Sequence, residues 1–186
     1  MPALTRLDPT PLVWQRVRGI RPSFALSGQD GIVATLTYFP EHRTLAQVET
    51  ADGAWTLKHR GFPASTVTLR EIGSKVDHAT FHPHLSGKGK LVFLNGDTFA
   101  WVRLEGDEPG GAFLDPHGMS LVRLSLCPDT SHRAIPEDIP LALVDAGRLH
   151  RCHAGPALLA TLGWYLLQFE TILEEAGTAA EMSLRI

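Results

Sequence analysis

Three histidines in the segment Asp77-His78-Ala79-Thr80-Phe81-His82-Pro83-His84 could do chemistry by binding a metal ion. If the segment is a strand, its side chains alternate between two faces, so His82 and His84 share one face and both imidazoles could ligate. His78 lies close enough in sequence to be considered as a third ligand. The pattern therefore makes these three histidines the candidate metal site.

The histidine pair is similar to the His-x-His motif of cupin barrels, which continues to a glutamate ligand and a last histidine. In this chain Lys88 or Gly89 takes the position of the glutamate, and Phe113 takes that of the last histidine. Lysine in place of an anionic ligand would weaken any divalent site. A small metal-dependent, cupin-like enzyme that uses His82 and His84 therefore stays the alternative interpretation.

Lysine and arginine clusters suggest a second chemistry, electrostatic contact with an anionic surface. Residues 58–90 carry a local excess of +4, whereas residues 97–138 carry a local excess of −5. Such asymmetry can mark a face for a charged partner, although two solvated surfaces would give the same pattern. Anionic lipid headgroups would bind such cations with about 1 kcal/mol for each residue. The predicted lipid-contacting residues are Arg16, Arg18, Lys58, Arg60, Lys88 and Lys90, and Arg21 extends the N-terminal cluster.

Composition narrows the class of protein. The 186 residues are 44% hydrophobic and 20% charged, as in an ordinary globular protein, and the net charge of −3 argues against nucleic acid as a partner. Two cysteines form no disulfide framework, and Met1-Pro2-Ala3 begins no targeting segment, so we expect a cytoplasmic protein that can lie peripherally at a membrane. Phosphate-binding loops and nucleophile elbows are missing, so we expect no cofactor and favour a protein without enzymatic activity.

The residues before Pro136 have the pattern of an all-β sandwich or barrel. Turn residues recur every 8 to 12 positions with short alternating segments between them. Asn95-Gly96 and Asp52-Gly53 are the strongest hairpin signals, because these residues tolerate the positive φ of tight turns. Segments near residues 12, 23, 32, 44, 54, 65, 76, 90, 98, 111, 119 and 131 predict about twelve strands, with bounds defined to about 2 to 4 residues.

The segment from Pro156 to about Glu175 predicts a helix that is apolar on nearly every side. Its uncharged run, Ala157 to Phe169, has about 13 residues, short of the roughly 20 that a membrane span needs. A surface helix would carry a charged face, so this helix must be enclosed by protein. The sequence therefore predicts a buried helix and no transmembrane segment.

Strands and helix together predict the fold. About eight strands close a barrel that its own side chains fill, and cans with more strands can hold a central helix. We therefore expect a mainly β protein: a closed antiparallel barrel of about twelve strands around a buried hydrophobic C-terminal helix. Residues 1–186 are expected to form one domain with a core from about residue 12 to 175.

One further signal is a likeness to a family. Leu158-Leu159-Ala160-Thr161-Leu162-Gly163-Trp164-Tyr165-Leu166-Leu167 after a β-rich body resembles bacterial members of the Tubby-like, LURP-one-related and phospholipid scramblase superfamily. Phe113-Leu114-Asp115-Pro116-His117-Gly118 and Trp55-Thr56-Leu57 fit its repeating hairpins, and the likeness extends from about Leu12 to Phe169. The resemblance implies a twelve-stranded barrel around a helix and a non-enzymatic binding or scaffold module. Tubby proteins bind phosphoinositides through basic side chains, but that motif does not align here.

Overall fold

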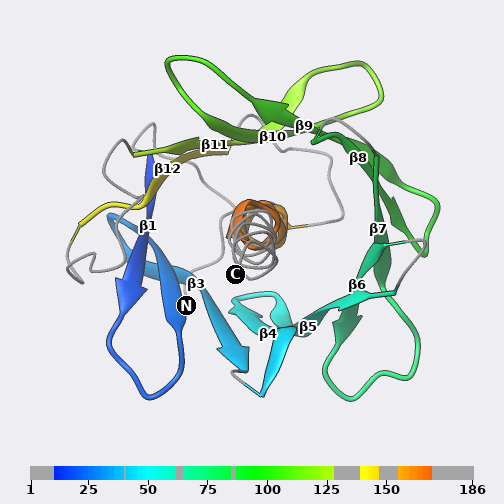
Figure 1. Ribbon diagram of the computed structural model, residues 1–186, viewed down its shortest axis with the longest axis horizontal. Helices are drawn as coiled ribbons and strands as arrows, with labels where there is room; N and C mark the ends of the chain where they lie inside the picture. The colour runs from blue at the N-terminus through cyan, green and yellow to red at the C-terminus, as the bar shows by residue number, and fades with distance from the viewer. Residues whose placement is uncertain are drawn as a thin grey trace, which may run out of the picture.

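Twelve strands form one closed antiparallel barrel (Figure 1). The computed structural model describes residues 11–39, 41–61, 65–84, 87–127, 139–146 and 155–168. The strands are β1 (Leu12–Val17), β2 (Ser23–Gly28), β3 (Gly31–Phe39), β4 (His42–Thr50), β5 (Gly53–Arg60), β6 (Thr66–Glu71), β7 (Ala79–Pro83), β8 (Gly89–Phe93), β9 (Thr98–Leu104), β10 (Gly110–Leu114), β11 (Ser120–Leu126) and β12 (Ala142–Ala146). The predicted fold class is confirmed.

The strand order is up-and-down. Each strand pairs with the strands before and after it in the chain, and the pairing of β1 with β12 closes the ring through Leu12 opposite Val144 and Trp14 opposite Ala142. Both strong hairpin signals are correct: Gly53 begins β5 with a φ of 147°, and Gly96 lies between β8 and β9 with a φ of 92°. Closure leaves no free sheet edge among the described strands, which removes the usual site of edge-to-edge aggregation.

Side chains alternate between the inside and the outside of the barrel, as the sequence pattern predicts. In β5, Trp55 and Leu57 are buried whereas Lys58 and Arg60 are exposed. In β7, Phe81 is buried and His82 is exposed. The two-residue period of a strand thus lines the inside with apolar side chains and places the charges outside.

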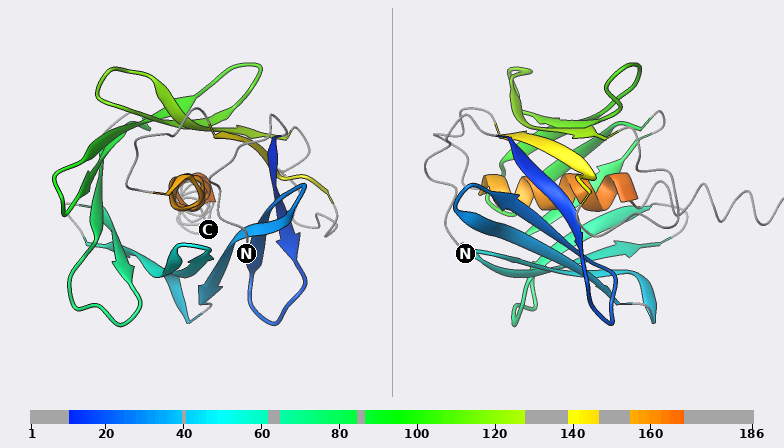
Figure 2. Two further views of the ribbon diagram at one scale, coloured as in Figure 1. Left: turned by 180° about the vertical axis from the view of Figure 1, so that it is seen from behind. Right: turned by 90° about the vertical axis from the view of Figure 1, so that its left-hand side faces the viewer.

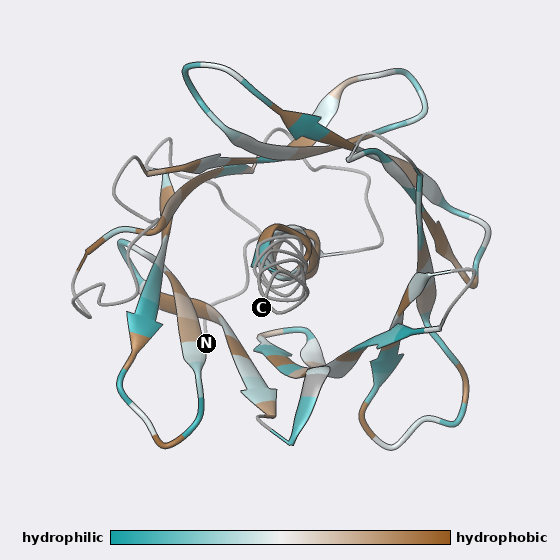
Figure 3. Cartoon of the chain, viewed as in Figure 1, coloured by the Kyte–Doolittle hydropathy of each residue, from teal (hydrophilic) through white to brown (hydrophobic). Residues whose placement is uncertain are grey.

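A helix over residues 156–168 lies along the barrel axis (Figures 1 and 2). All residues from 157 to 167 are buried, and Figure 3 shows a mainly hydrophobic helix inside the ring of strands. The helix begins beside the β4–β5 turn, where Gly155 lies against the carboxylate of Asp52. Further along, the Tyr165 hydroxyl donates a hydrogen bond to the Thr44 carbonyl at 2.7 Å. Burial of this helix is confirmed, while its predicted continuation over residues 169–175 lies outside the described residues.

The helix packs tightly against the wall at Gly163. A Cβ on Gly163 would lie 2.7 Å from Cδ1 of Leu124 and 3.1 Å from Cζ3 of Trp101. Both distances are below ordinary van der Waals contact, so a larger side chain would have to displace the wall. Glycine at this position lets the helix backbone pack directly against β9 and β11.

Two strand predictions need correction. The segment predicted near residue 76 is a connection, and β7 begins only at Ala79. The segment predicted near residue 131 lies outside the described residues, and the twelfth strand is β12, which the sequence analysis missed because Pro136 and Pro140 suggested a broken segment. Proline is tolerated just before a strand, and β12 starts after Pro140. Within the described residues, no helix is long and apolar enough to cross a membrane.

A candidate binding end of the barrel

Charge is segregated along the barrel axis. We call the end that contains residues 18–22, 84, 87–88 and 105–109 the basic end, and the end that contains residues 29–30, 51–52, 72–78, 94–97 and 115–119 the acidic end. The described Lys and Arg residues nearer the basic end are Arg16, Arg18, Arg21, Lys58, Arg60, Lys88, Lys90 and Arg103, against the carboxylates Glu41, Glu105, Asp107 and Glu108. The described carboxylates nearer the acidic end are Asp30, Glu49, Asp52, Glu71, Asp77, Asp97 and Asp115, against Arg70 and Lys75. Arg123 and Asp145 lie opposite each other midway along the wall and belong to neither end.

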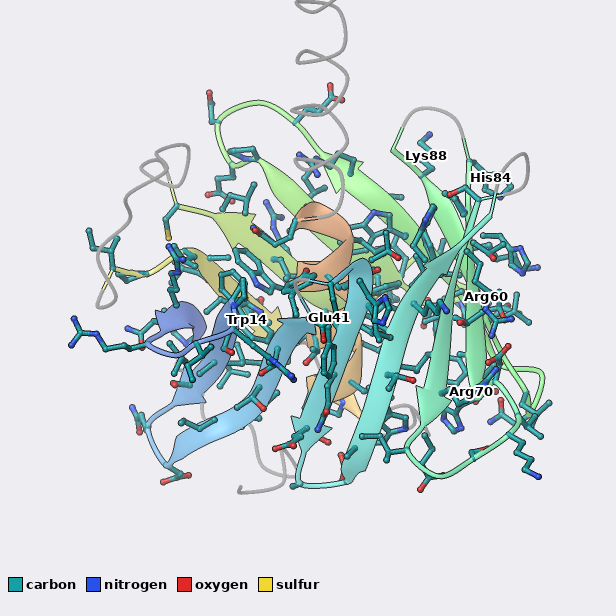
Figure 4. The ribbon with its side chains drawn as sticks, turned by 60° about the horizontal axis from the view of Figure 1, so that its bottom comes forward. Trp14, Glu41, Arg60, Arg70, His84 and Lys88 are labelled. Atoms are coloured by element: carbon teal, nitrogen blue, oxygen red, sulfur yellow. The ribbon has the colours of Figure 1, made fainter. Side chains whose placement is uncertain are left out.

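Every predicted lipid-contacting residue lies toward the basic end. Arg16, Arg18 and Arg21 belong to β1 and the β1–β2 connection, Lys58 and Arg60 to β5, and Lys88 and Lys90 to β8 and the connection before it. Figure 4 shows Lys88 and His84 together at this end, with Arg70 much further along the barrel. Neighbouring strands are about 4.8 Å apart, so the groups on β1–β2 and β5, and those on β5 and β8, are about 14 Å apart along the wall. The interval from β8 around to β1 is five strand steps, about 24 Å. The cations therefore form a broken ring around the barrel mouth.

The three candidate metal ligands are not brought together. His78 lies before β7 at the acidic end, with its ring against Phe93 at 5.5 Å, whereas His84 follows β7 at the basic end. Six residues of extended chain separate the two by about 20 Å. His82 and His84 are both exposed, as the strand argument predicts for a pair on one face. Among the residues that the structure describes, no three His, Cys, Asp or Glu side chains group closely enough to hold a metal ion.

A cleft of about 560 Å³ opens at the basic end between the β7–β8 and β9–β10 connections. Its apolar lining comes from Phe81, Pro83, Trp101, Leu104 and Pro109. Its polar lining comes from His84, Lys88, Arg103 and Glu105. The cleft thus combines an apolar floor with charged walls, the arrangement typical of sites for small amphipathic ligands.

Aromatic rings that lie flat along the wall form the floor of this cleft. The Phe81 ring occupies the space above Gly89, where a Cβ would lie 2.1 Å from the ring, and Trp101 lies over Gly111 in the same way. Trp101 also packs against Phe113 with ring centroids 4.8 Å apart. Its buried indole nitrogen has no hydrogen-bond partner among the described residues. The indole nitrogens of Trp14 and Trp164 are likewise buried without a partner among these residues, so this feature does not by itself mark a ligand site.

The interior at this end also holds both tyrosines of the chain. Tyr38 on β3 stacks on Tyr165 of the helix with centroids 5.9 Å apart. Burial, and secondarily the neighbouring Tyr165, raises the pKa of Tyr38 well above its ordinary value. Burial likewise raises the pKa of Tyr165. Both hydroxyls therefore stay protonated at neutral pH and belong to the packing of the helix.

Sequence reasoning found the basic residues but missed the cleft. Lys88 was predicted from its charge, whereas Trp101, which is buried and lines the cleft, was not singled out. Arg103 and Glu105 carried no signal, because only the fold places the end of β9 and the β9–β10 connection next to the β7–β8 connection.

Fold and site together define a closed twelve-stranded antiparallel barrel with a buried helix and one basic mouth. No family model, curated protein or solved structure matches the chain. Membership of the Tubby-like superfamily is therefore a prediction from the sequence pattern.

Proposed function

We propose that this protein is a non-enzymatic binding module of the Tubby-like type that contacts anionic phospholipid headgroups through its basic end. One observation carries the proposal: cations gather at one end of the barrel and carboxylates at the other. A flat anionic surface would attract the first end and repel the second, so the field of the membrane would orient the barrel axis along the membrane normal. The ring of cations would then meet the headgroups together.

The β1–β2 connection adds an apolar contact to this surface. Ile20 is fully exposed there, with Arg18 and Arg21 beside it in the chain. The guanidinium of Arg21 lies 4.6 Å from the centre of the Phe39 ring, which ties the connection to the barrel wall. An apolar side chain between cations suits the boundary between headgroups and acyl chains, where amphipathic segments bind. The location that follows is peripheral, at the anionic cytoplasmic leaflet.

Sedimentation with vesicles tests the proposal. The protein should sediment with vesicles that contain phosphatidylglycerol and not with phosphatidylcholine alone. Binding should fade with salt as the Debye length falls from about 10 Å at 0.1 M to about 3 Å at 1 M. The double variant Lys88→Glu with Lys90→Glu should bind more than about 30-fold more weakly, because each lost cation removes about 1 kcal/mol.

The matched control is Lys75→Glu, which reverses an exposed cation near the acidic end. It should leave vesicle binding unchanged if only the basic end faces the membrane. If Lys75→Glu weakens binding as much as the reversal of Lys88 does, net charge alone governs binding, and the oriented contact is refuted. Failure of the parent protein to sediment with anionic vesicles at low salt would refute the lipid contact itself.

A further inference from the structure

We infer that the cleft lined by Phe81, Trp101, Lys88, Arg103 and Glu105 binds one anionic phospholipid at a time, by a phosphate headgroup that also carries hydroxyls. The inference rests on the proposed function and makes it more specific, because a diffuse ring of cations cannot distinguish headgroups of equal charge. A glycerol headgroup is the simplest one with the required chemistry.

The cations of the cleft come from the β7–β8 connection and from the end of β9, which touch each other. Gly87 has a φ of 66°, and a Cβ there would lie 2.9 Å from Cβ of Arg103, so the backbone before Lys88 rests on the stem of Arg103. Lys88 and Arg103 therefore enter the same cleft from two neighbouring hairpins. Arginine and lysine donors together match the several acceptor oxygens of a phosphate group.

Glu105 determines which chemical groups a ligand can carry beside its phosphate. Its carboxylate lines the same cleft and would repel a second acidic group on the ligand. An ionised carboxylate can only accept hydrogen bonds, so it favours a headgroup that offers hydroxyl donors. A glycerol headgroup supplies such hydroxyls, whereas a serine headgroup of the same net charge carries an ammonium and a carboxylate on one carbon atom, so that attraction and repulsion at Glu105 largely cancel.

The apolar floor of the cleft would contact the part of the lipid next to its headgroup. Phe81 and Trp101 are only 3% and 1% exposed, so the apolar surface that a ligand meets comes mainly from Pro83, Leu104 and Pro109 above them. The lipid glycerol backbone and the first methylenes of the acyl chains fit this surface chemically. The Trp101 indole nitrogen is buried just beneath it, so its N–H signal would report a bound ligand without contacting it. A volume of about 560 Å³ holds such a headgroup region but no full pair of acyl chains.

Lys90 provides the matched control for a single soluble lipid molecule, because the ring of cations to which Lys90 belongs acts only where a vesicle presents a surface of many headgroups. It lies two residues after Lys88 near the same end, carries the same charge and is exposed. It pairs across the strands with His82 on the outer face of the wall and does not line the cleft. Diffuse attraction predicts that Lys88→Ala and Lys90→Ala lose equal affinity for the lipid. A specific cleft predicts that only Lys88→Ala loses affinity.

The experiment is a titration followed by the indole N–H signals of the ¹⁵N-labelled full chain, with Trp101→Phe to assign the Trp101 signal. The probes are water-soluble dihexanoyl phosphatidylglycerol, phosphatidylserine and phosphatidylcholine, together with glycerol phosphate and inorganic phosphate. We expect phosphatidylglycerol to shift the Trp101 signal at saturable concentration, phosphatidylserine to bind several-fold more weakly, and phosphatidylcholine to cause no shift. Lys88→Ala should raise the Kd about tenfold or more, and Lys90→Ala less than about twofold.

Three results would overturn the inference. Equal losses for the two lysine variants would show diffuse attraction, and equal affinity for the glycerol and serine headgroups would remove the role of Glu105. Binding of inorganic phosphate as tight as that of the lipid would make the cleft a free-phosphate site. Vesicle sedimentation of the same proteins separates this inference from the proposed function. If the protein sediments with anionic vesicles but soluble phosphatidylglycerol does not shift the Trp101 signal, the cleft is refuted and the proposed function is not.

Discussion

The two ends of the barrel are built alike and differ in charge. Both consist of connections between antiparallel strands and both expose large apolar side chains, Ile20 at 103% on the basic end and Leu94 at 71%, together with Met119, Val76 and Ile72, on the acidic end. Cations surround the first, whereas Asp97 and its neighbours accompany the second. An exposed apolar residue at a turn therefore says little about function until the sign of the surrounding charge is known.

Folding does not require this separation of charge. Among the described residues, Arg70 of β6 pairs with Asp77 of the β6–β7 connection at 2.7 Å, and Arg123 of β11 pairs with Glu108 of the β9–β10 connection at 2.8 Å. Partly exposed pairs of this kind contribute about 0 to 1 kcal/mol each. Stability comes instead from the apolar interior that both ends share. A segregation that contributes so little to stability is better explained by a charged partner at one end.

Disrupting the shared interior should give the largest effect. Leu162 is 2% exposed in the middle of the helix, so Leu162→Asp would place an unpaired carboxylate among apolar side chains. We expect a loss of more than several kcal/mol, comparable to the whole stability of a domain, and no folded protein by circular dichroism. Leu143→Asp, on the exposed face of β12, is the control and should fold. A Leu162→Asp variant that melts within a few degrees of the parent would show that the helix is not enclosed.

The pH dependence of unfolding tests the packing near the basic end. The pKa values of Tyr38 and Tyr165 are raised by burial, so the folded state favours protonated tyrosine. This stabilisation is complete below the unfolded pKa of about 10 and is lost as pH rises above it, by up to about 1.4 kcal/mol per pH unit for each tyrosine. Because the chain has only these two tyrosines, tyrosinate absorbance should appear together with the loss of near-ultraviolet circular dichroism.

Tyr165→Phe should leave one ionising group and a shallower fall of stability above pH 10. Tyrosinate that forms near pH 10 in a protein with intact circular dichroism would show that Tyr38 and Tyr165 are accessible to water. Helix and wall would then be less closely packed at the basic end than at the acidic end.

The fold was predictable because it depends on local patterns of hydrophobicity. Trp55 and Leu57 alternate with polar residues, and the helix around Leu162 has no charged face. The spacing of apolar residues along the sequence is therefore enough to predict the strands and the buried helix. β12 was missed because its five residues follow two prolines and lack β-branched or aromatic residues other than Val144. Short strands of this kind depend on the pairing that the rest of the barrel offers them.

The cleft was not predictable from the sequence, because it depends on register. Lys88 and Arg103 are fifteen positions apart, and no periodicity brings them together. They meet because β7, β8 and β9 pair in a particular register, with Gly89 opposite Trp101. Charge clusters in the sequence therefore located the basic end but not the cleft within it.

The smallest expected effect compares the exposed apolar residues of the two ends directly. Ile20→Ser removes a side chain whose full transfer from water would contribute about 1.5–3 kcal/mol, and partial insertion among headgroups would contribute less. We therefore expect about tenfold weaker sedimentation with anionic vesicles and an unchanged Tm, since Ile20 contributes nothing to the core. Leu94→Ser makes an equivalent change at the acidic end, which the proposed orientation turns away from the membrane, and should leave binding within about twofold. Equal losses of vesicle binding in the two variants would mean that the barrel lies on its side or binds in both orientations, because only a barrel with its basic end toward the lipid brings Ile20 to the membrane and keeps Leu94 away from it.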